Sequence, residues 1–460
     1  MGQAKLAVIA VAAFILSSCS KQTPEAALRE ALTRQTMGII RLPDGDLVLN
    51  EPLRLPKNAT EMSIRGGALS RLIAGKDFKG PALIVIEGGK KITLTDFVID
   101  GNRGERAKPL EMAPPENAFR IWYADNGILA DQVEGLEISQ VTFHNVVNFP
   151  VLVSRSSAVR IHDVTVEDSG SLNAKGRNNL TGGILLEEGT ADFEVHDSSF
   201  RNIRGNALWT HSLLTSPQLL DGKFSSNKFE LIGRDAIQVG HAKRVVVEDN
   251  KGREIGYPFE VVDVENGGTP VVIDTAGDVE GAQYQRNHFD EVNGKCIDLD
   301  GFHDGIVTDN SCINRKGAAD YPNGHFGIVM NNTNPNTHSA NIELNGNLID
   351  GAKYGGLFVM GSGNHIANNR FVNLNLAGCN ESSPACVYKK DEPEMLQSGI
   401  YVGKGPARPE EAKGNVIRNN KITGHKMATR CIAVAPGIVR SANTIEENQC
   451  ENAEPVPAPH

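Results

Sequence analysis

Residues 221–252 read DGKFSSNKFELIGRDAIQVGHAKRVVVEDNKG, and this stretch decides the fold. It holds two copies of one pattern, in which Asn227 and Asn250 each lie at a bend after a short apolar strand. Eight asparagines along the chain occupy this place: Asn227, Asn250, Asn287, Asn310, Asn347, Asn369, Asn420 and Asn448. Asparagine tolerates the left-handed backbone of a sharp bend, and stacked amides can bond from layer to layer. The repeat therefore predicts a stack of similar coils.

A second strand follows each bend, and its apolar residues alternate with others. Examples are Ala236-Ile-Gln-Val, Cys296-Ile-Asp-Leu and Gly327-Ile-Val-Met. Alternation with period two indicates a strand with one buried face and one exposed face. One coil is too short to bury its apolar face alone, so the coils above and below it must cover that face.

Composition supports this view. The chain has 460 residues, 47 of them Gly, with 22% charged and 5% aromatic residues. These values exclude wholesale disorder and collagen, and the turn-forming residues argue against a helical bundle. The net charge of -10 excludes a protein that binds nucleic acid through bulk positive charge, so no nucleic-acid partner is expected.

The asparagine register and coil length resemble those of the right-handed parallel β-helix of the pectate-lyase-like superfamily, over residues 90–450. The resemblance implies an all-β, single-stranded right-handed parallel β-helix of about 10–12 coils. In that superfamily an N-terminal helix often caps the solenoid, and Thr23 and Pro24 are suitable as the N-cap and first residue of such a helix. We expect a signal peptide at 1–18, a lipidated tether and capping helix at 19–37, the β-helix at 38–450 and a disordered tail at 451–460. We expect a monomer.

The N-terminus has the pattern of a bacterial export signal. Lys5 precedes the apolar run 6–15, which is too short for a permanent membrane span. The sequence Leu16-Ser-Ser-Cys19 resembles the bacterial lipobox, in which the cysteine is lipidated, and by that resemblance Ser20 favours sorting to the outer membrane. We therefore expect a lipid anchor at Cys19 and a location in the bacterial cell envelope, on the periplasmic or the surface face.

The other six cysteines allow fifteen disulfide connectivities in an oxidising compartment. Cys379 and Cys386 lie close together in a polar insertion and are the expected pair. Cys312 and Cys450 fall on the recurring large apolar position of the repeat, so they are interpreted as buried apolar side chains.

Irregular spacing of the repeats marks insertions near residues 103–125, 172–182, 264–283, 315–325 and 375–398. Long loops on a regular scaffold are common places for binding surfaces.

The alternation on the second strands predicts two outward lines of side chains on one face. One line holds Glu187, His211, Gly240 with His241 beside it, Asp263, Asp300 and Asn331, and the other holds Leu185, Trp209, Gln238, Asp298, Val329, Phe358 and Tyr401. Glu265 is an alternative to Asp263. Acids beside flat rings suit an extended sugar chain, whose apolar faces pack on rings and whose hydroxyls bond polar groups. A polysaccharide partner is the prediction.

Asp298 and Asp300 are the predicted carboxylate catalysts, assisted by His211, His241 or His303. Their Cα atoms are expected about 6.5 to 7 Å apart on one strand. Carboxyl groups about 6.5–9.5 Å apart serve an inverting glycoside hydrolase. Alternatively, Asp263, Asp298 and Asp300 could hold Ca²⁺ through oxygen ligands.

A polysaccharide lyase is a second possibility. It would need a base, for which His211, His241 or His303 is the candidate, and a cation, for which Arg155 or Arg234 is the candidate.

The pair His303-Asp304 resembles the end of the Asp-Pro-His-Asp motif of mannuronan epimerases, although Gly301-Phe302 replaces Asp-Pro. Hydrolase, lyase and epimerase thus stay open. A further alternative is a non-catalytic surface protein that binds a glycan or a partner, since exposed acids on strands and turns also serve structure and solubility.

Overall fold

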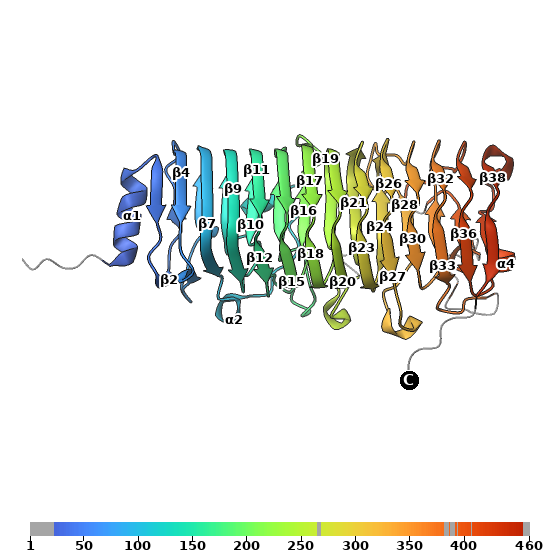
Figure 1. Ribbon diagram of the computed structural model, residues 1–460, viewed down its shortest axis with the longest axis horizontal. Coiled ribbons are helices and arrows are strands. Elements are labelled where there is room, and N and C mark those ends of the chain that lie inside the picture. The colour runs from blue at the N-terminus through green and yellow to red at the C-terminus, as the bar shows by residue number, and fades with distance from the viewer. Residues whose placement is uncertain are drawn as a thin grey trace, which may run out of the picture.

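The computed structural model describes residues 23–264, 268–380, 386, 392, 394–405 and 407–453. Figure 1 shows one elongated stack of strands that runs from α1 (Pro24–Arg34) at the blue end to β38 (Thr444–Glu446) at the red end. Every pairing between the described strands of successive coils is parallel, and three columns of strands surround one apolar interior. The fold is a parallel β-helix, as the repeat predicted.

The first column runs from one end of the stack to the other. It contains β1 (Gly38–Arg41), β4 (Thr60–Arg65), β7 (Lys90–Asp100), β9 (Glu134–His144), β11 (Ser157–His162), β14 (Ala191–His196), β17 (Leu219–Ser225), β19 (Ile237–Glu248), β22 (Gln283–Gln285), β26 (Ile306–Thr308), β29 (Glu343–Asn345), β32 (His365–Ala367), β35 (Val416–Arg418) and β38. The short β25 (Phe302–His303) pairs with the end of β21 (Val271–Glu280).

The second column follows the asparagine bends. It contains β2 (Gly45–Leu49), β5 (Ser70–Ala74), the ends of β7 and β9, β12 (Thr165–Glu167), β15 (Ser199–Ile203), β18 (Lys228–Ile232), β20 (Lys251–Ile255), β23 (His288–Val292), β27 (Ser311–Ile313), β30 (Leu348–Asp350), β33 (Arg370–Leu374), β36 (Lys421–Gly424) and β39 (Gln449–Asn452).

The third column carries the face on which the sequence places the site. It contains β3 (Leu53–Arg54), β6 (Ala82–Glu87), β8 (Asn126–Asp131), β10 (Val151–Ser154), β13 (Ile184–Glu187), β16 (Leu208–His211), the start of β19, β21, β24 (Lys295–Asp300), β28 (Ile328–Asn331), β31 (Leu357–Val359), β34 (Ile400–Val402) and β37 (Ile432–Val434).

The described chain has few helices beside the strand columns. Beyond α1, they are α2 (Arg103–Arg106), α3 (Phe119–Trp122), α4 (Met427–Arg430) and the single-turn helices η1 (Phe259–Val261), η2 (Ala318–Asp320), η4 (Met395–Gln397) and η5 (Arg440–Ala442). In α1 the Thr23 hydroxyl accepts from the Ala26 N–H, which confirms the predicted cap, and Leu28 and Leu32 pack on the first coils. Among the described residues, no helix is both long and apolar enough to cross a membrane.

The asparagine ladder is continuous. Asn287 shows the pattern: its Nδ2 donates to Asn310 Oδ1 at 2.8 Å, and its Oδ1 accepts from Asn250 Nδ2 at 2.9 Å. The same side-chain bond links all eight predicted asparagines in order, from Asn227 to Asn448. The ladder satisfies backbone groups at the bend as well, because each amide also bonds a carbonyl of the preceding strand.

Two expectations need correction. Residues 264–283 are not one insertion, because β21 continues the third column there. Cys312 is buried in the core as expected and Cys450 is partly buried, but their interpretation as plain apolar side chains missed that they form disulfides with Cys296 and Cys431.

Several predictions from the sequence concern residues near or beyond the limits of the described chain. Cys379 and Cys386 form the predicted pair. Strand β39 continues to Asn452, into the predicted tail, and residues 454–460 lie outside the described part. The signal peptide and Cys19 also lie outside it.

Candidate functional site

The register of the third column aligns the predicted line from Leu185 to Tyr401. The strand partners in order are Leu129, Leu152, Leu185, Trp209, Gln238, Asp274, Asp298, Val329, Phe358 and Tyr401. Asp274 on β21 is the member that the sequence analysis missed. The signal was present, because Ile273-Asp-Thr on β21 repeats the pattern of Ile297-Asp-Leu on β24.

The second line also differs at one place from expectation. It passes from Glu187 and His211 through Gly240 and Ala276 to Asp300 and Asn331. Asp263 does not join it. The Asp263 carboxylate accepts from Asn173 Nδ2 at 2.6 Å, and the Asp263 N–H donates to Asn178, so this residue ties the loop before β21 to the loop after β12. Glu265 lies outside the described residues.

At the N-terminal end of this face, the insertion between β7 and β8 covers the outward residues. Phe119 and Tyr123 pack with Leu129, Leu152, Leu185 and Trp209 in a second apolar core, separate from the interior of the solenoid. Trp209 is only 4% exposed. The expected open row of side chains is therefore closed over these coils.

Glu187 lies under the same insertion. Its two oxygens accept from the N–H groups of Phe119 at 2.8 Å and Arg120 at 3.0 Å. Burial raises the pKa of Glu187 to about 7 despite these bonds. The contacts give Glu187 a role in holding α3.

His211 stacks on Phe119 with ring centroids 4.3 Å apart. Burial lowers its pKa to about 4, and His241 adds to the effect, so the ring is neutral at pH 7. Burial also lowers the pKa of His241. The Nδ1 atoms of both rings are buried without a hydrogen-bond partner.

At the C-terminal end, Phe358 and Tyr401 are covered as well. Their rings stack 5.8 Å apart, and the Tyr401 hydroxyl donates to Glu392 Oε2 at 2.9 Å. Met395 and Leu396 of η4 are buried over this end. The two predicted aromatic residues are thus structural contacts of the last insertion.

Between the two covered ends lies a cluster of charged residues. Asp235, Asp274 and Asp298 come from three successive coils, and Lys295 and Arg234 lie among them. Lys295 forms an ion pair with Asp298 Oδ2, while Asp298 Oδ1 is buried without a partner. Gln238 Nε2 donates to Asp274 Oδ2 at 2.5 Å, and Asp235 Oδ1 accepts from the Val271 N–H at 2.9 Å. We call these five charged residues the carboxylate cluster.

The charges in the carboxylate cluster do not balance, since three carboxylates face two cations. Burial, and then the neighbouring Asp235 and Asp298 carboxylates, raise the pKa of Asp274 well above its usual value. Burial likewise raises the pKa of Asp235 to about 6. For Lys295, burial favours the neutral form, but Asp298, Asp274 and Asp235 outweigh it and raise its pKa. Asp274 therefore holds a proton near neutral pH while Lys295 stays charged.

The remaining predicted residues have separate partners. Asp300 accepts from the Thr333 N–H at 2.7 Å and from its hydroxyl, and burial raises its pKa. Arg155 forms an ion pair with Asp131, and Asn331 Oδ1 accepts from the Asn332 N–H. Asp263, Asp298 and Asp300, the alternative Ca²⁺ ligands, bond Asn173, Lys295 and Thr333 respectively, and they are not among the groups of described residues whose ligand atoms lie within 4.8 Å of one another.

His303 and Asp304 lie at the corner between the third and first columns. His303 bonds Asp304 at 2.7 Å and Asp278 at 2.9 Å, and it stacks on His338 at 4.2 Å. Burial opposes its charge, but the two carboxylates raise its pKa. One ligand atom each of His303, Asp304 and His338 lie within 4.8 Å of one another, so these residues could hold a transition metal ion.

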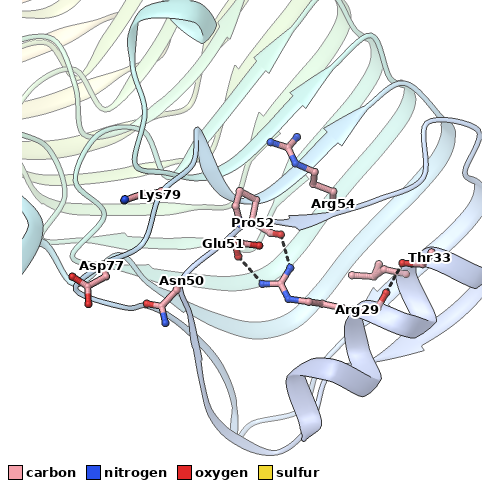
Figure 2. A pocket seen from close by; sticks show the side chains of 9 residues that line it. Arg29, Thr33, Asn50, Glu51, Pro52, Arg54, Asp77 and Lys79 are labelled. Carbon is pink, nitrogen blue, oxygen red and sulfur yellow. Dashed lines mark hydrogen bonds between the residues drawn. The ribbon is translucent and has the colours of Figure 1, made fainter. Parts of the chain in front are cut away.

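Two surface cavities lie at different places along the solenoid. A cavity of about 470 Å³ is lined by Trp209, His211, Gln238, His241 and Ala276 beside the carboxylate cluster. A larger one, of about 700 Å³, lies between α1 and the loops near residues 50–54 and 77–79. Figure 2 shows Arg29 reaching from α1 to the carbonyls of Glu51 and Pro52, both at 2.8 Å. These bonds hold the capping helix on the solenoid.

Comparisons with known proteins agree on the fold. No protein-family model matches the chain, and no curated protein matches its sequence. Among solved structures, DFA-IIIase from Arthrobacter chlorophenolicus is similar at 14% identity, with a TM-score of 0.50 over 92% of this chain and 91% of that one. The catalytic domain of a GH87 alpha-1,3-glucanase in complex with tetrasaccharides gives 12% identity and a TM-score of 0.53 over 92% of this chain and 68% of that one. The Dettilon tailspike protein gives 12% identity and 0.51 over 75% and 62%. Identities this low establish the β-helix fold alone.

Proposed function

We propose that this protein is a glycoside hydrolase whose catalytic groups are Asp274 and Asp298. The observation that carries the proposal is their contrast in state: Asp274 has a strongly raised pKa, and Asp298, one strand away, is paired with Lys295. A carboxyl group with a raised pKa beside a second carboxylate that is paired with a cation is the pattern of an acid and its partner carboxylate in glycoside hydrolysis.

In this mechanism the Asp274 carboxylic acid donates its proton to the glycosidic oxygen as the bond to the anomeric carbon breaks. The Asp298 carboxylate forms a bond to that carbon as the leaving group departs, and water that gives its proton back to Asp274 then displaces Asp298 to complete hydrolysis. Adjacent strands are about 4.8 Å apart. That distance is nearer to the about 5–5.5 Å of retaining enzymes than to the about 6.5–9.5 Å of inverting ones. Asp298 is therefore assigned as the nucleophile of a retaining mechanism. Asp300, on the same strand, is the alternative second carboxylate for an inverting mechanism.

A hydrolase is favoured over a lyase by the cations. A lyase needs a cation facing the carboxyl group of a uronate. Arg155 is paired with Asp131, and Arg234 lies 3.5 Å from Asp235. The likeness to two structures named as a DFA-IIIase and a glucanase supports a carbohydrate substrate as analogy of fold.

The rival function is glycan binding without cleavage. It is favoured by Asp300, whose carboxylate is already engaged by Thr333, and by the low exposure of Asp298. The two functions separate in one assay: the purified protein is incubated with neutral and acidic polysaccharides while new reducing ends and unsaturated uronates are measured.

The matched variants are Asp274→Asn and Asp221→Asn, the latter in an exposed pair with Arg244 on the first column. Hydrolysis predicts new reducing ends without unsaturated uronates, lost in Asp274→Asn and kept in Asp221→Asn. Full activity of Asp274→Asn would overturn the assignment.

We further propose that the protein is anchored to the bacterial outer membrane through acyl chains on Cys19. The support is the lipobox-like Leu16-Ser-Ser-Cys19 and the short stretch between Cys19 and the start of α1. The test is fractionation of cells that express Cys19→Ala. The variant is expected in the soluble fraction, and its retention in the membrane fraction would contradict the anchor.

A further inference from the structure

The 470 Å³ cavity beside the carboxylate cluster forms where two small residues of the second outward line lie between larger ones. Along the second outward line, the long side chains of His211 and Asp300 flank Gly240 and Ala276, which fill little space. Gly240 also comes close to the preceding coil, since a Cβ there would lie 2.7 Å from the Thr210 carbonyl oxygen. A larger residue is therefore excluded at the floor of the cavity.

Loops from three places wall this cavity. Pro115 and Glu116 come from the insertion between β7 and β8, Leu213 and Leu214 from the loop after β16, and Asn334 from the loop after β28. Leu214 leans over the floor, where its Cδ2 would lie 3.7 Å from a Cβ added to Gly277. The residue is still 50% exposed and stands at the rim.

The face does not continue as a groove along the solenoid on either side. Toward the N-terminus, Phe119 and Tyr123 occupy the surface above Leu152 and Leu185. Toward the C-terminus, the stacked Phe358 and Tyr401 rings are buried beneath Glu392 and η4. From β19 to β28 only three strand spacings, about 14 Å, separate the two covered regions.

We propose that the cavity receives the terminal unit of a neutral glycan, so that the protein acts at chain ends and not within a chain. This inference rests on the proposed hydrolase function and names its class of substrate. A bound end ring would lie against Leu214, with its hydroxyls near Gln238 and the two histidines.

The chemistry of the lining supports a neutral sugar. No Lys or Arg is among the described residues that line the cavity, and Glu116 is its acidic member. Both histidines have lowered pKa values, and their buried Nδ1 atoms have no protein partner. Neutral imidazoles and an amide can exchange hydrogen bonds with hydroxyls, whereas a uronate carboxylate would be desolvated here without a cation.

The first experiment measures binding by calorimetry. The probes are the methyl glycosides of glucose, galactose, mannose and fructose, with glucuronate and galacturonate for comparison. We expect one or more neutral glycosides to bind and the uronates not to bind. Leu214→Trp should fill the cavity and weaken binding at least tenfold. Leu69→Trp is the control, because Leu69 is 70% exposed and lies on the first coils. Preferred binding of uronates, no binding of any probe, or equal binding by Leu214→Trp would overturn the inference.

The second experiment follows cleavage of neutral hexasaccharides labelled at the reducing end. Action at chain ends predicts labelled products that shorten one unit at a time, or release of the labelled unit itself. A mixture of internal fragments from the first time point would overturn the inference while leaving hydrolysis intact. Conversely, binding of neutral glycosides without any cleavage would overturn the hydrolase and leave the cavity's role in binding chain ends.

Discussion

Lys295 is expected to stabilise the fold through charge, and the effect of removing it should depend on pH. The Lys295 and Asp298 side chains are 15% and 9% exposed, and Asp274 and Asp235 also raise the Lys295 pKa. Lys295→Met keeps most of the volume but leaves Asp298 with both oxygens unpartnered. Removing one member of a buried ion pair costs about 3–5 kcal/mol. We expect a loss of that size in the free energy of unfolding at pH 7.5.

The pH dependence follows from the carboxylates. Without Lys295, the folded state holds protons on Asp274 and Asp235 up to a higher pH than the unfolded chain does. Stability then falls as pH rises above the unfolded carboxyl pKa, about 3.9. At pH 4 Asp274 and Asp235 are protonated in both variants, so the difference between wild type and Lys295→Met should shrink.

The assay is urea unfolding of both proteins at pH 4 and pH 7.5, followed by circular dichroism. Lys353→Met is the matched control, because Lys353 donates to the Pro322 carbonyl and burial lowers its pKa. Its effect should not grow from pH 4 to pH 7.5. An equal loss for Lys295→Met at both pH values would refute the reasoning, since it would mean that Lys295 contributes by packing.

Three further predictions address other parts of the molecule. Asp274→Asn should lower the hydrolysis rate by about 10²–10⁴-fold, measured on whichever glycan the wild type cleaves, with unchanged circular dichroism. Asn287→Ala removes five side-chain hydrogen bonds, two from Asn250 and one each to Val247, Gln285 and Asn310, so urea unfolding should show a loss of about 5 kcal/mol at about 1 kcal/mol a bond, against no change for the exposed Asn58→Ala. Because burial raises the pKa of Glu187 from 4.5 to about 7, the folded protein keeps a proton that the unfolded chain releases; the free energy of unfolding should drop by about 3 kcal/mol as pH rises from 4.5 to 7, and Glu187→Gln should remove that part of the slope.

The repeat could be predicted from the sequence because its causes are local. Each of the eight asparagines must bond the next coil at the same bend, so the residue recurs wherever the bend does. The first outward line was predictable for a similar reason, since period two fixes which side chains of β16, β24 and β31 point outward. Only the member of this line on β21 was not predicted, because the loop before β21 is long and displaces the strand from the regular spacing of the repeat.

What covers each outward residue was not predictable from the repeat. Phe119 and Tyr123 lie in a segment without periodicity, yet they bury Trp209. Glu187, expected as an exposed acid, instead accepts a hydrogen bond from the Phe119 N–H at the start of α3. The carboxylate cluster was missed in part for the same reason. Asp235 and Lys295 lie at the edges of their strands, where the alternation does not predict which way a side chain points. Only the stacking of three coils brings them to Asp274.

The order of residues along the third column explains why the site lies where it does. The outward line is apolar at Leu129, Leu152 and Leu185, polar at Gln238, Asp274 and Asp298, and apolar again from Val329 to Tyr401. Insertions cover both apolar stretches, since a continuous apolar stripe exposed to water is unfavourable. The polar centre has no apolar cover, and its buried groups bond one another across adjacent coils, Gln238 with Asp274 and Lys295 with Asp298. A hydroxyl-rich ligand can add such bonds only where the face is open, so the cavity between Gln238 and the half-exposed Leu214 is the part suited to bind a sugar.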